Sequence, residues 1–537
     1  MEALTPRGDA RSMTNSLKFV PFAGLLLASQ ALAGEPWLAP GNSQVRHDIQ
    51  LLVDEGVLNL PMSGWPIPVS DLAAALARIP SPQPSPQPSP AGAGEGAQSP
   101  STASTAEGRG EGLTPAQSAA IARLRKIAAE GRPALGVEVR AAARPMVLRT
   151  FDDEPREEGE LTGYAAGFLG DRWGGRLELT AVADPDDDEA FRLDGSYLAG
   201  KFGNWIVTAG AQDRWWGSSW QGSLILSNSA RPVPALSLDR AVSDPFETKW
   251  LRWIGPWRLT TFMGYMEGDR QDYDHPLLFG MRISARPLDG LEISVERTAQ
   301  WCGEGRSCTW DDFWNLWSGN DNAGENVDPE DEPGNQLAGW DIRWASPIGS
   351  WDYALYWQHT GETIDNQIPR PYRSMELAGV ETWGSTRDES GSWRLGLEWA
   401  QTLCGGTENE QKLWDCAYNN GIFNVEGYRS KGRPLAHSMD GDGETFGLRY
   451  MRVNANADTF TALLRYNMIN EGGADPDTRH TVAPGPEDWW SIDFTYRRPM
   501  PGGWLEASVG ADYQDRLWNE TSALLARASL SWRHEFD

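Results

Sequence analysis

Residues 213–240 combine cationic, acidic, amide and indole side chains in one segment between two stretches of alternating polarity. Indole faces can cover the apolar face of a pyranose ring, while arginine, aspartate and asparagine bond hydroxyl and acid groups in fixed geometry. The segment therefore has the chemistry of a sugar-binding surface, although an irregular loop packed by its own aromatic residues has the same composition. The predicted binding residues are Asp213, Arg214, Trp215, Trp216, Trp220, Asn228, Arg231, Asp239 and Arg240.

The formal net charge of −28 argues against a nucleic-acid partner, because phosphate backbones require clustered cations. An acidic protein that holds an acidic polymer must gather its arginines locally or use bridging divalent cations. Arg214, Arg231 and Arg240 meet the first condition.

Catalytic motifs are missing from the sequence, which contains no GxSxG elbow, HExxH motif or phosphate loop. No catalytic residue, metal or cofactor is predicted, yet the many carboxylates leave a glycosidase-like pair open. The acidic run 440–444 is a candidate calcium site, because hard cations favour clustered carboxylate oxygens. Its spacing does not match a complete EF-hand loop, so a solvated acidic hairpin is expected.

Four cysteines form two local pairs, Cys302 with Cys308 and Cys404 with Cys416. In an exported protein this pattern predicts two disulfides that close loops. A zinc site is the alternative for these cysteines, but neither spacing matches the CxxC motif of a zinc knuckle.

The N-terminal residues predict export. Lys18 precedes an apolar stretch, and Ala31-Leu32-Ala33 resembles a cleavage site, so residues 1–33 are expected to be a signal peptide starting at Met1 or Met13. Residues 34–134 are predicted to form a small periplasmic helical domain with helices near 42–57, 71–78 and 114–131. Its insert, residues 80–113, is rich in Pro, Gly, Ala and Ser and is expected to be disordered.

From about residue 135 the pattern changes to a period of two. Phe279, Met281 and Ile283 alternate with Gly280, Arg282 and Ser284, which gives one apolar and one polar face. Alternation alone does not distinguish a soluble sandwich from a membrane barrel.

Connection lengths favour the barrel. Short turns alternate with mostly longer, polar connections over about 18 strands, as in bacterial outer-membrane barrels with short periplasmic turns. Residues 135–537 are thus predicted to form an all-β, antiparallel transmembrane barrel. The segment 213–248 is expected as one outer connection, lying outside or folded into the lumen.

The run 212–217, followed by 222–228 and Ala230-Arg231-Pro232, resembles the capsule assembly Wzi family, as does the run 45–52. The resemblance implies an outer-membrane barrel that holds capsular or related exopolysaccharide, with outer-membrane lipid and lipopolysaccharide as further partners and a monomer as the expected state. A sugar-selective porin and an outer-membrane glycan hydrolase are the alternatives.

Overall fold

The computed structural model describes residues 35–79, 112–129, 134–170, 172–318, 334–346, 351–364, 371–405, 412–413, 416–419, 426–473 and 480–536. The predicted signal peptide and residues 80–111 of the predicted insert lie outside these ranges. No helix in the described part of the chain is long and apolar enough to cross a membrane.

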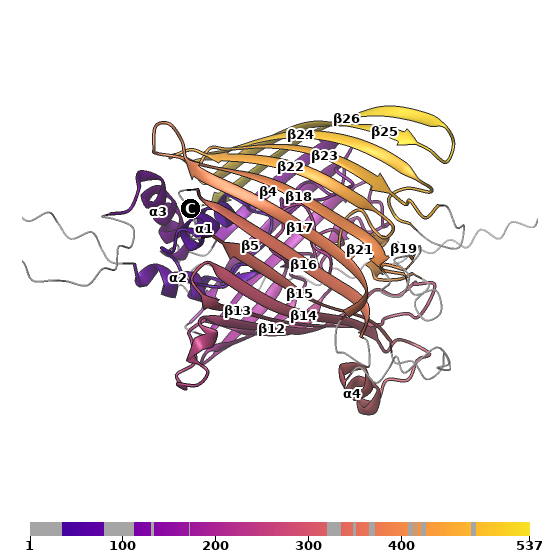
Figure 1. The fold of residues 1–537 in the computed structure, drawn as a ribbon, viewed down its shortest axis with the longest axis horizontal. Helices are drawn as coiled ribbons and strands as arrows, with labels where there is room; N and C mark the ends of the chain where they lie inside the picture. Colours follow the sequence, from indigo (N-terminus) through magenta and orange to yellow (C-terminus); the bar gives the residue numbers. More distant parts are fainter. Residues whose placement is uncertain are drawn as a thin grey trace, which may run out of the picture.

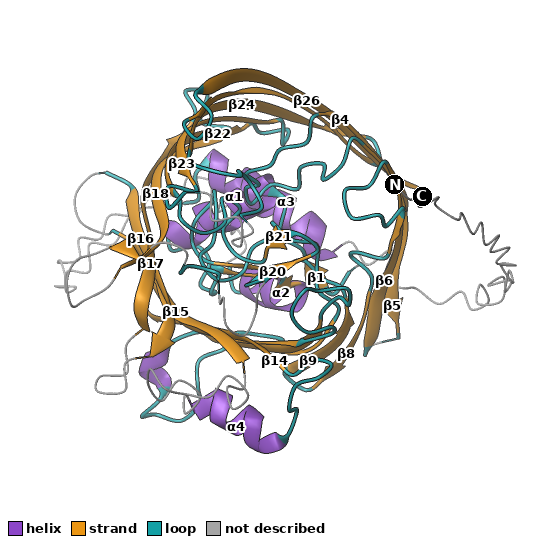
Figure 2. Cartoon of the chain, turned by 90° about the vertical axis from the view of Figure 1, so that its right-hand side faces the viewer, coloured by secondary structure: helices purple, strands orange, loops and turns teal. Residues whose placement is uncertain are grey.

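Eighteen antiparallel strands close into a barrel (Figures 1 and 2). The last strand pairs with the first, where Phe536 lies opposite Leu135, so the sheet has no free edge. The wall strands are β4 (Ala134–Ala143), β5 (Gly159–Leu169), β6 (Trp173–Ala183), β8 (Tyr197–Phe202), β9 (Trp205–Gly210), β11 (Ala235–Arg240), β12 (Trp257–Tyr265), β13 (Leu277–Leu288), β14 (Leu291–Trp301), β15 (Gly334–Ala345), β16 (Tyr353–Ile364), β17 (Pro371–Ser385), β18 (Ser392–Gly405), β22 (Glu444–Val453), β23 (Thr459–Ile469), β24 (Glu487–Met500), β25 (Gly503–Arg516) and β26 (Thr521–Phe536). Short β7 (Phe191–Arg192) and β19 (Lys412–Leu413) pair with β6 and β18.

The two faces of the wall differ as the alternation predicts. On β13, Arg282 and Ser284 are buried in the lumen, whereas Ile283 between them is exposed on the outside. Arg282 pairs there with Asp341 at 3.2 Å. A polar, ion-paired interior inside an apolar outer face is the arrangement of a membrane barrel, and it excludes the soluble sandwich.

Both ends of the barrel sheet lie at the same mouth, which also carries turns such as 289–290 and 501–502. We call this mouth the periplasmic end, because bacterial barrels place their short turns there, and the opposite mouth the outer end. The predicted connection 213–248 is wrong in extent. Its residues 235–240 form strand β11, and residues 241–256, which include the 3-10 helix η1 (Arg252–Ile254), connect β11 to β12 at the periplasmic end.

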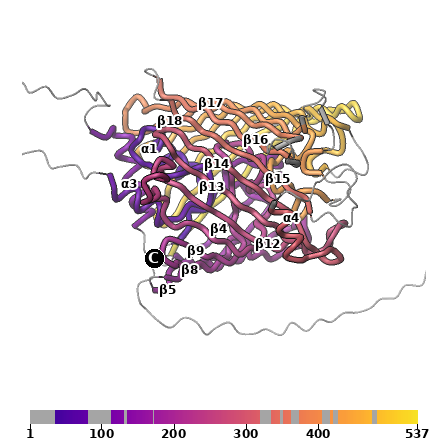
Figure 3. The backbone as a smooth tube through the Cα atoms, turned by 60° about the horizontal axis from the view of Figure 1, so that its bottom comes forward, coloured from indigo at the N-terminus to yellow at the C-terminus, as the bar shows by residue number. Residues whose placement is uncertain are grey.

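Three helices fill the periplasmic mouth: α1 (Ser43–Asp54), α2 (Val69–Ala77) and α3 (Pro115–Ala129) (Figures 2 and 3). The side chain of Asn42 caps α1 by accepting a hydrogen bond from the Val45 amide at 3.1 Å. Almost all of α1 is buried, including His47 and Gln50, which is expected for a helix enclosed by a polar lumen. Short β1 (Trp37–Leu38) pairs with β3 (Ile67–Pro68) beside these helices.

Candidate functional site

The connection between β9 and β11, residues 211–234, folds from the outer end into the lumen. Its strand β10 (Trp215–Trp216) pairs with β2 (Gly64–Trp65) of the N-terminal region. The amide of Gly217 also donates to the Ser63 carbonyl at 2.8 Å. Segments that enter from opposite mouths therefore meet inside the barrel; we call residues 211–234 the inward segment.

Trp220 occupies the centre of this meeting point. Its ring lies between two guanidinium groups, with Arg46 of α1 at 4.1 Å and Arg449 of β22 at 4.4 Å from the ring centroid. Burial lowers the pKa of Arg46 to about 9, although Glu381 opposes this shift. The indole N–H donates to Oε1 of Glu381 at 2.6 Å, which ties the inward segment to the wall.

All three predicted indoles are enclosed: Trp215, Trp216 and Trp220 are 0, 1 and 3 % exposed. Trp215 packs edge-on against Phe151, and Trp216 against Phe262. The expectation that these indoles offer open faces to a sugar ring is wrong for this structure. They instead fix the inward segment in place, as in the alternative of a loop packed by its own aromatic residues.

The polar neighbours of the indoles are largely occupied by the protein itself. Arg214 donates to the Gln212 carbonyl at 3.1 Å and lies 4.3 Å from the Phe262 ring centroid, and burial lowers its pKa to about 10. Asp213 is half-buried, 3.4 Å from Arg156. Asn228 donates weakly to the backbone carbonyl of Phe151 at 3.4 Å.

Arg214 and Asp213 also line a cavity of about 20 Å³ beside Arg231. This space has room for a water molecule and is too small for a sugar ring.

Asp239 and Arg240 do not join the other predicted residues. They end β11, where Arg240 pairs with Trp205 at the periplasmic end, far along the strand from the outer mouth. Asp239 accepts a hydrogen bond from Ser237, and Arg240 donates to the Trp257 carbonyl at 3.0 Å. The prediction that they belong to the binding loop is wrong. Strand β11 has only six residues and follows Pro232 and Pro234, so the sequence pattern does not indicate it.

Arg231 lies at the outer end, in a network of charged side chains. Its guanidinium pairs with Asp194 at 2.6 Å, Asp187 at 2.7 Å and Glu189 at 2.8 Å. Burial opposes ionisation, but these carboxylates raise the pKa of Arg231 above its ordinary value. The full network, which we call the outer charge network, consists of Glu157, Asp187, Glu189, Arg192, Asp194, Arg231 and Lys431.

The outer charge network joins four parts of the chain that lie far apart in the sequence. These are the connection between β4 and β5, which contributes Glu157, the connection before β8, the inward segment, and the hairpin formed by β20 (Arg429–Ser430) and β21 (Arg433–Pro434). Glu189 is its most exposed member, with 47 % of its side chain exposed, and Asp194 and Lys431 are each 25 % exposed. Ionised groups of both signs thus reach the outer surface here.

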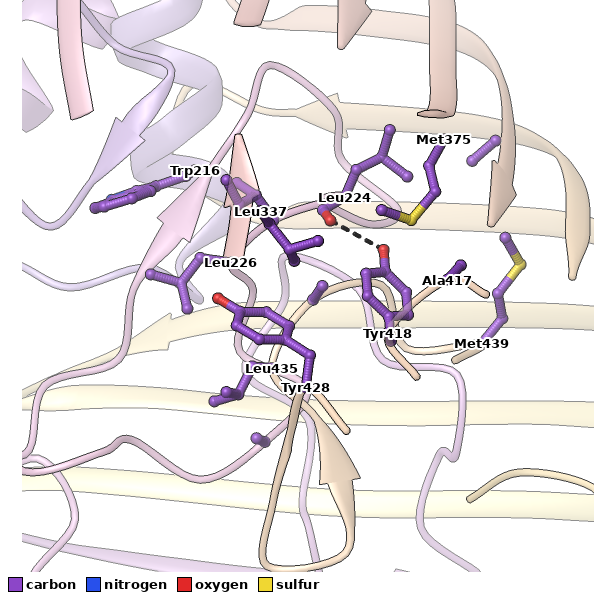
Figure 4. Packing of buried hydrophobic residues seen from close by; sticks show 14 of the residues in the cluster. Trp216, Leu224, Leu226, Leu337, Met375, Ala417, Tyr418, Tyr428, Leu435 and Met439 are labelled. Carbon is purple, nitrogen blue, oxygen red and sulfur yellow. Dashed lines mark hydrogen bonds between the residues drawn. The ribbon is translucent and has the colours of Figure 1, made fainter. Parts of the chain in front are cut away.

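An apolar cluster of buried side chains joins the inward segment to other connections inside the barrel (Figure 4). Leu224 and Leu226 of the inward segment pack with Leu435 and with Tyr418, whose hydroxyl donates to the Leu224 carbonyl at 3.0 Å. The connection between β18 and β22 is held against this cluster by the disulfide of Cys404 and Cys416. Both predicted pairings occur, since Cys302 and Cys308 are also bonded.

The acidic run 440–444 is not a solvated hairpin, and that prediction is wrong. Asp440 is buried and pairs with Arg429 at 2.7 Å. Burial alone would raise the pKa of Asp440, but Arg429 and His480 hold it below its ordinary value. Among the described residues, no group of three or more His, Cys, Asp or Glu side chains is arranged to hold a metal ion.

Sequence reasoning missed the residues that fasten the inward segment. Glu381 accepts bonds from Trp220, Gln50, Arg343 and Arg394, and Glu398 accepts the amides of Trp220 and Gln221 at 3.1 Å. The sequence does contain a signal for them, because both glutamates stand in alternating strands at positions that face the lumen.

The fold and this interior define a class: a closed 18-stranded antiparallel barrel with an apolar outer face and an occupied lumen is an outer-membrane β-barrel protein. The chain belongs to the capsule assembly protein Wzi family, whose model matches residues 138–523.

Two known proteins are similar to this chain, one in sequence and one in fold. An uncharacterised 55.8 kDa protein from the cps region of Klebsiella pneumoniae is 27 % identical over 456 residues, which cover 83 % of this chain and 80 % of the relative. The structure of Wzi of Escherichia coli, described as a carbohydrate-binding β-barrel involved in group 1 capsule assembly, matches with a TM-score of 0.76. That match has 22 % identity and covers 93 % of this chain and 99 % of the other.

Proposed function

We propose that the protein binds capsular or a related surface polysaccharide and retains it at the outer membrane, and that it acts without catalysis. Membership of the capsule assembly family supports the class of ligand. The observation that carries the proposal is that the inward segment and its apolar cluster lie inside the barrel, while the exposed charges of the outer charge network lie at the outer end. This arrangement offers a polymer a surface to lie on.

The nine predicted binding residues divide into three roles in this proposal. The half-buried Asp213 contacts polymer hydroxyl groups, and Arg231 holds Asp187, Glu189 and Asp194 in the outer charge network that the polymer meets. Arg214, Trp215, Trp216, Trp220 and Asn228 hold the inward segment in the shape that presents Asp213 and Arg231. Asp239 and Arg240 stabilise the barrel wall at its other end.

The porin alternative is disfavoured by the occupied lumen, since α1 and the inward segment meet in its centre. The glycan hydrolase is disfavoured by the engagement of the carboxylates at that meeting point. Glu381 and Glu398 each accept several hydrogen bonds from protein groups, which leaves them structural.

A deletion strain complemented with variants tests the proposal through the amounts of cell-bound and released polysaccharide. Arg231→Ala should release polymer while the barrel keeps its heat-modifiable migration. Arg214→Ala and Trp216→Ala should release polymer and also lower the temperature of the migration change. If all three variants keep folded barrels and all of their polymer, the binding surface lies elsewhere. Shortened glycan chains in the wild type would instead indicate a hydrolase.

A further inference from the structure

Helix α4 (Trp310–Ser318) lies outside the barrel, beyond the wall formed by β14 and β15 (Figure 2). It begins with a capping box, in which the Thr309 amide donates to the Asp312 carboxylate at 2.7 Å and the Asp312 amide donates to Thr309 Oγ1 at 3.2 Å. The helix is therefore a defined element on the outer side of the wall and does not contribute to the plug.

Two side chains attach α4 to the membrane-facing side of the wall. Leu316 is buried, and the Phe313 ring lies 5.6 Å from Phe279 and 5.2 Å from Trp301. Phe279 has the same strand parity as the exposed Ile283, so it points outward. The apolar contact thus continues the surface that faces lipid.

Arg297 of β14 reinforces the attachment. Its guanidinium donates to the Trp317 carbonyl at 2.6 Å and to the Leu316 carbonyl, which lie in the last turn of α4. A cation at that position satisfies carbonyls that have no partner within the helix and complements the helix dipole.

Three tryptophans of α4 remain exposed although they make edge-on contacts with Phe313 or with one another: Trp310, Trp314 and Trp317 are 77, 56 and 45 % exposed. They stand at positions i, i+4 and i+7, which lie on one face of a helix. Asp311 and Asn315 are exposed on the side away from Phe313 and Leu316, next to the tryptophan face. The helix is amphipathic, with an apolar face wider than its contact with the wall.

The height of α4 on the wall is fixed by the strands beneath it. Phe279 pairs with Ala299, and Leu277 with Trp301, so the helix covers the last residue pairs of β13 and β14 at the outer end. Indoles favour the boundary between headgroups and acyl chains, where one part of the ring is wet and the other apolar.

We infer that α4 lies in the outer leaflet, with its tryptophan face in contact with lipid at the boundary between headgroups and acyl chains. Interfacial helices bury their apolar face about 5–10 Å into this region. The disulfide of Cys302 and Cys308 shortens the tether between the end of β14 and the start of α4. The helix is thereby kept at the membrane surface and holds residues 302–318 against the lipid.

Depth-dependent quenching tests the inference in the full-length protein. Trp314→Cys and, as a control at an exposed polar position outside the tryptophan face, Asp311→Cys are labelled with an environment-sensitive fluorophore. The proteins are reconstituted in vesicles of phosphatidylcholine and lipopolysaccharide that contain nitroxide lipids labelled near the headgroup or at the chain end. Mass spectrometry first verifies that the Cys302–Cys308 bond is intact. Trp310→Cys replaces Trp314→Cys if the latter does not fold.

The expected result is strong quenching at position 314 by the headgroup-proximal nitroxide, weaker quenching by the chain-end nitroxide, and little quenching at position 311 by either. Equal quenching at both positions, or at neither, overturns the inference. Shielding of position 314 only after capsular polysaccharide is added would show a polymer surface and also overturn it. Energy transfer between labelled copies that disappears on dilution in lipid would show a contact between copies, with the same consequence.

Discussion

The carboxylate of Glu381 accepts a hydrogen bond from Trp220 Nε1 at 2.6 Å, although the two residues are 161 positions apart. Oε2 of the same carboxylate accepts from Gln50 of α1 at 2.7 Å and from Arg343 and Arg394 of the wall. One side chain therefore joins the inward segment, the N-terminal helix and the barrel.

Replacing Glu381 with alanine should lower the free energy of unfolding by about 3–5 kcal/mol, because Arg343 and Arg394 would lose a buried partner. Denaturant unfolding in detergent micelles measures the change. Glu389→Ala in the exposed turn after β17 is the control and should change it by less than about 0.5 kcal/mol. Equal effects of the two variants would contradict the role of Glu381.

The wild-type protein should pass little current in planar bilayers, and Trp220→Ala should increase it. Removal of a buried indole between Arg46 and Arg449 leaves a cavity where the two halves of the plug meet, at a cost of about 3–5 kcal/mol. Trp250→Ala, which alters an exposed indole at the periplasmic end, should leave the current unchanged. A large steady conductance of the unmodified protein would restore the porin alternative.

Glu154, in the connection between β4 and β5, should make stability depend on pH. Burial raises its pKa to about 7 against the opposing charge of Arg149. Oε1 accepts from Thr150 at 2.8 Å, and Oε2 has no hydrogen-bond partner in the described part of the chain. An acid with a raised folded pKa contributes stability that is complete below its unfolded pKa of about 4.3 and is lost as pH rises through about 7.

Glu154→Gln should therefore reduce the fall in unfolding free energy between pH 5 and 8, as measured by denaturant titration. Glu158→Gln, at an exposed position of the same connection, should keep the wild-type slope. If all three proteins have the same slope, Glu154 does not carry the dependence.

Arg231→Lys should retain less polymer than the wild type and more than Arg231→Ala. Lysine keeps the charge, but it lacks the planar fork that engages Asp194 and Asp187 together. The ratio of cell-bound to released polysaccharide measures retention. Arg78→Ala removes an exposed arginine at the periplasmic end, paired with Asp244, and should leave the ratio unaltered. Equal retention by all variants would remove Arg231 from the proposed contact surface.

The barrel was predictable because its signal is local. Period-two alternation, as on β13, reports which side chains face lipid, and connection lengths report the two ends of the barrel. Strand β11 was not predicted, because its six residues, which follow two prolines, are too few to show the alternation. Helix α4 was missed as well, although its aromatic residues have helical spacing.

The site was less predictable because its geometry depends on contacts between distant residues. The composition of 213–220 fits both a sugar surface and a packed plug. The contacts that make it a packed plug come from Phe151, Arg46, Glu381 and Glu398, and none of these residues lies near the segment in the sequence.

The docking of α1 also constrains the order in which the molecule assembles. His47 and Ser392 share a hydrogen bond of 2.8 Å across 345 residues of chain. Hairpins between successive strands close over short loops, whereas contacts of such large separation form slowly. The helix is synthesised before every strand of the wall, yet the wall residues that bind it exist only after β17 and β18 have been made. Export must therefore deliver α1 before its partners in the wall are present, and the helix becomes enclosed only when β17 and β18 have formed.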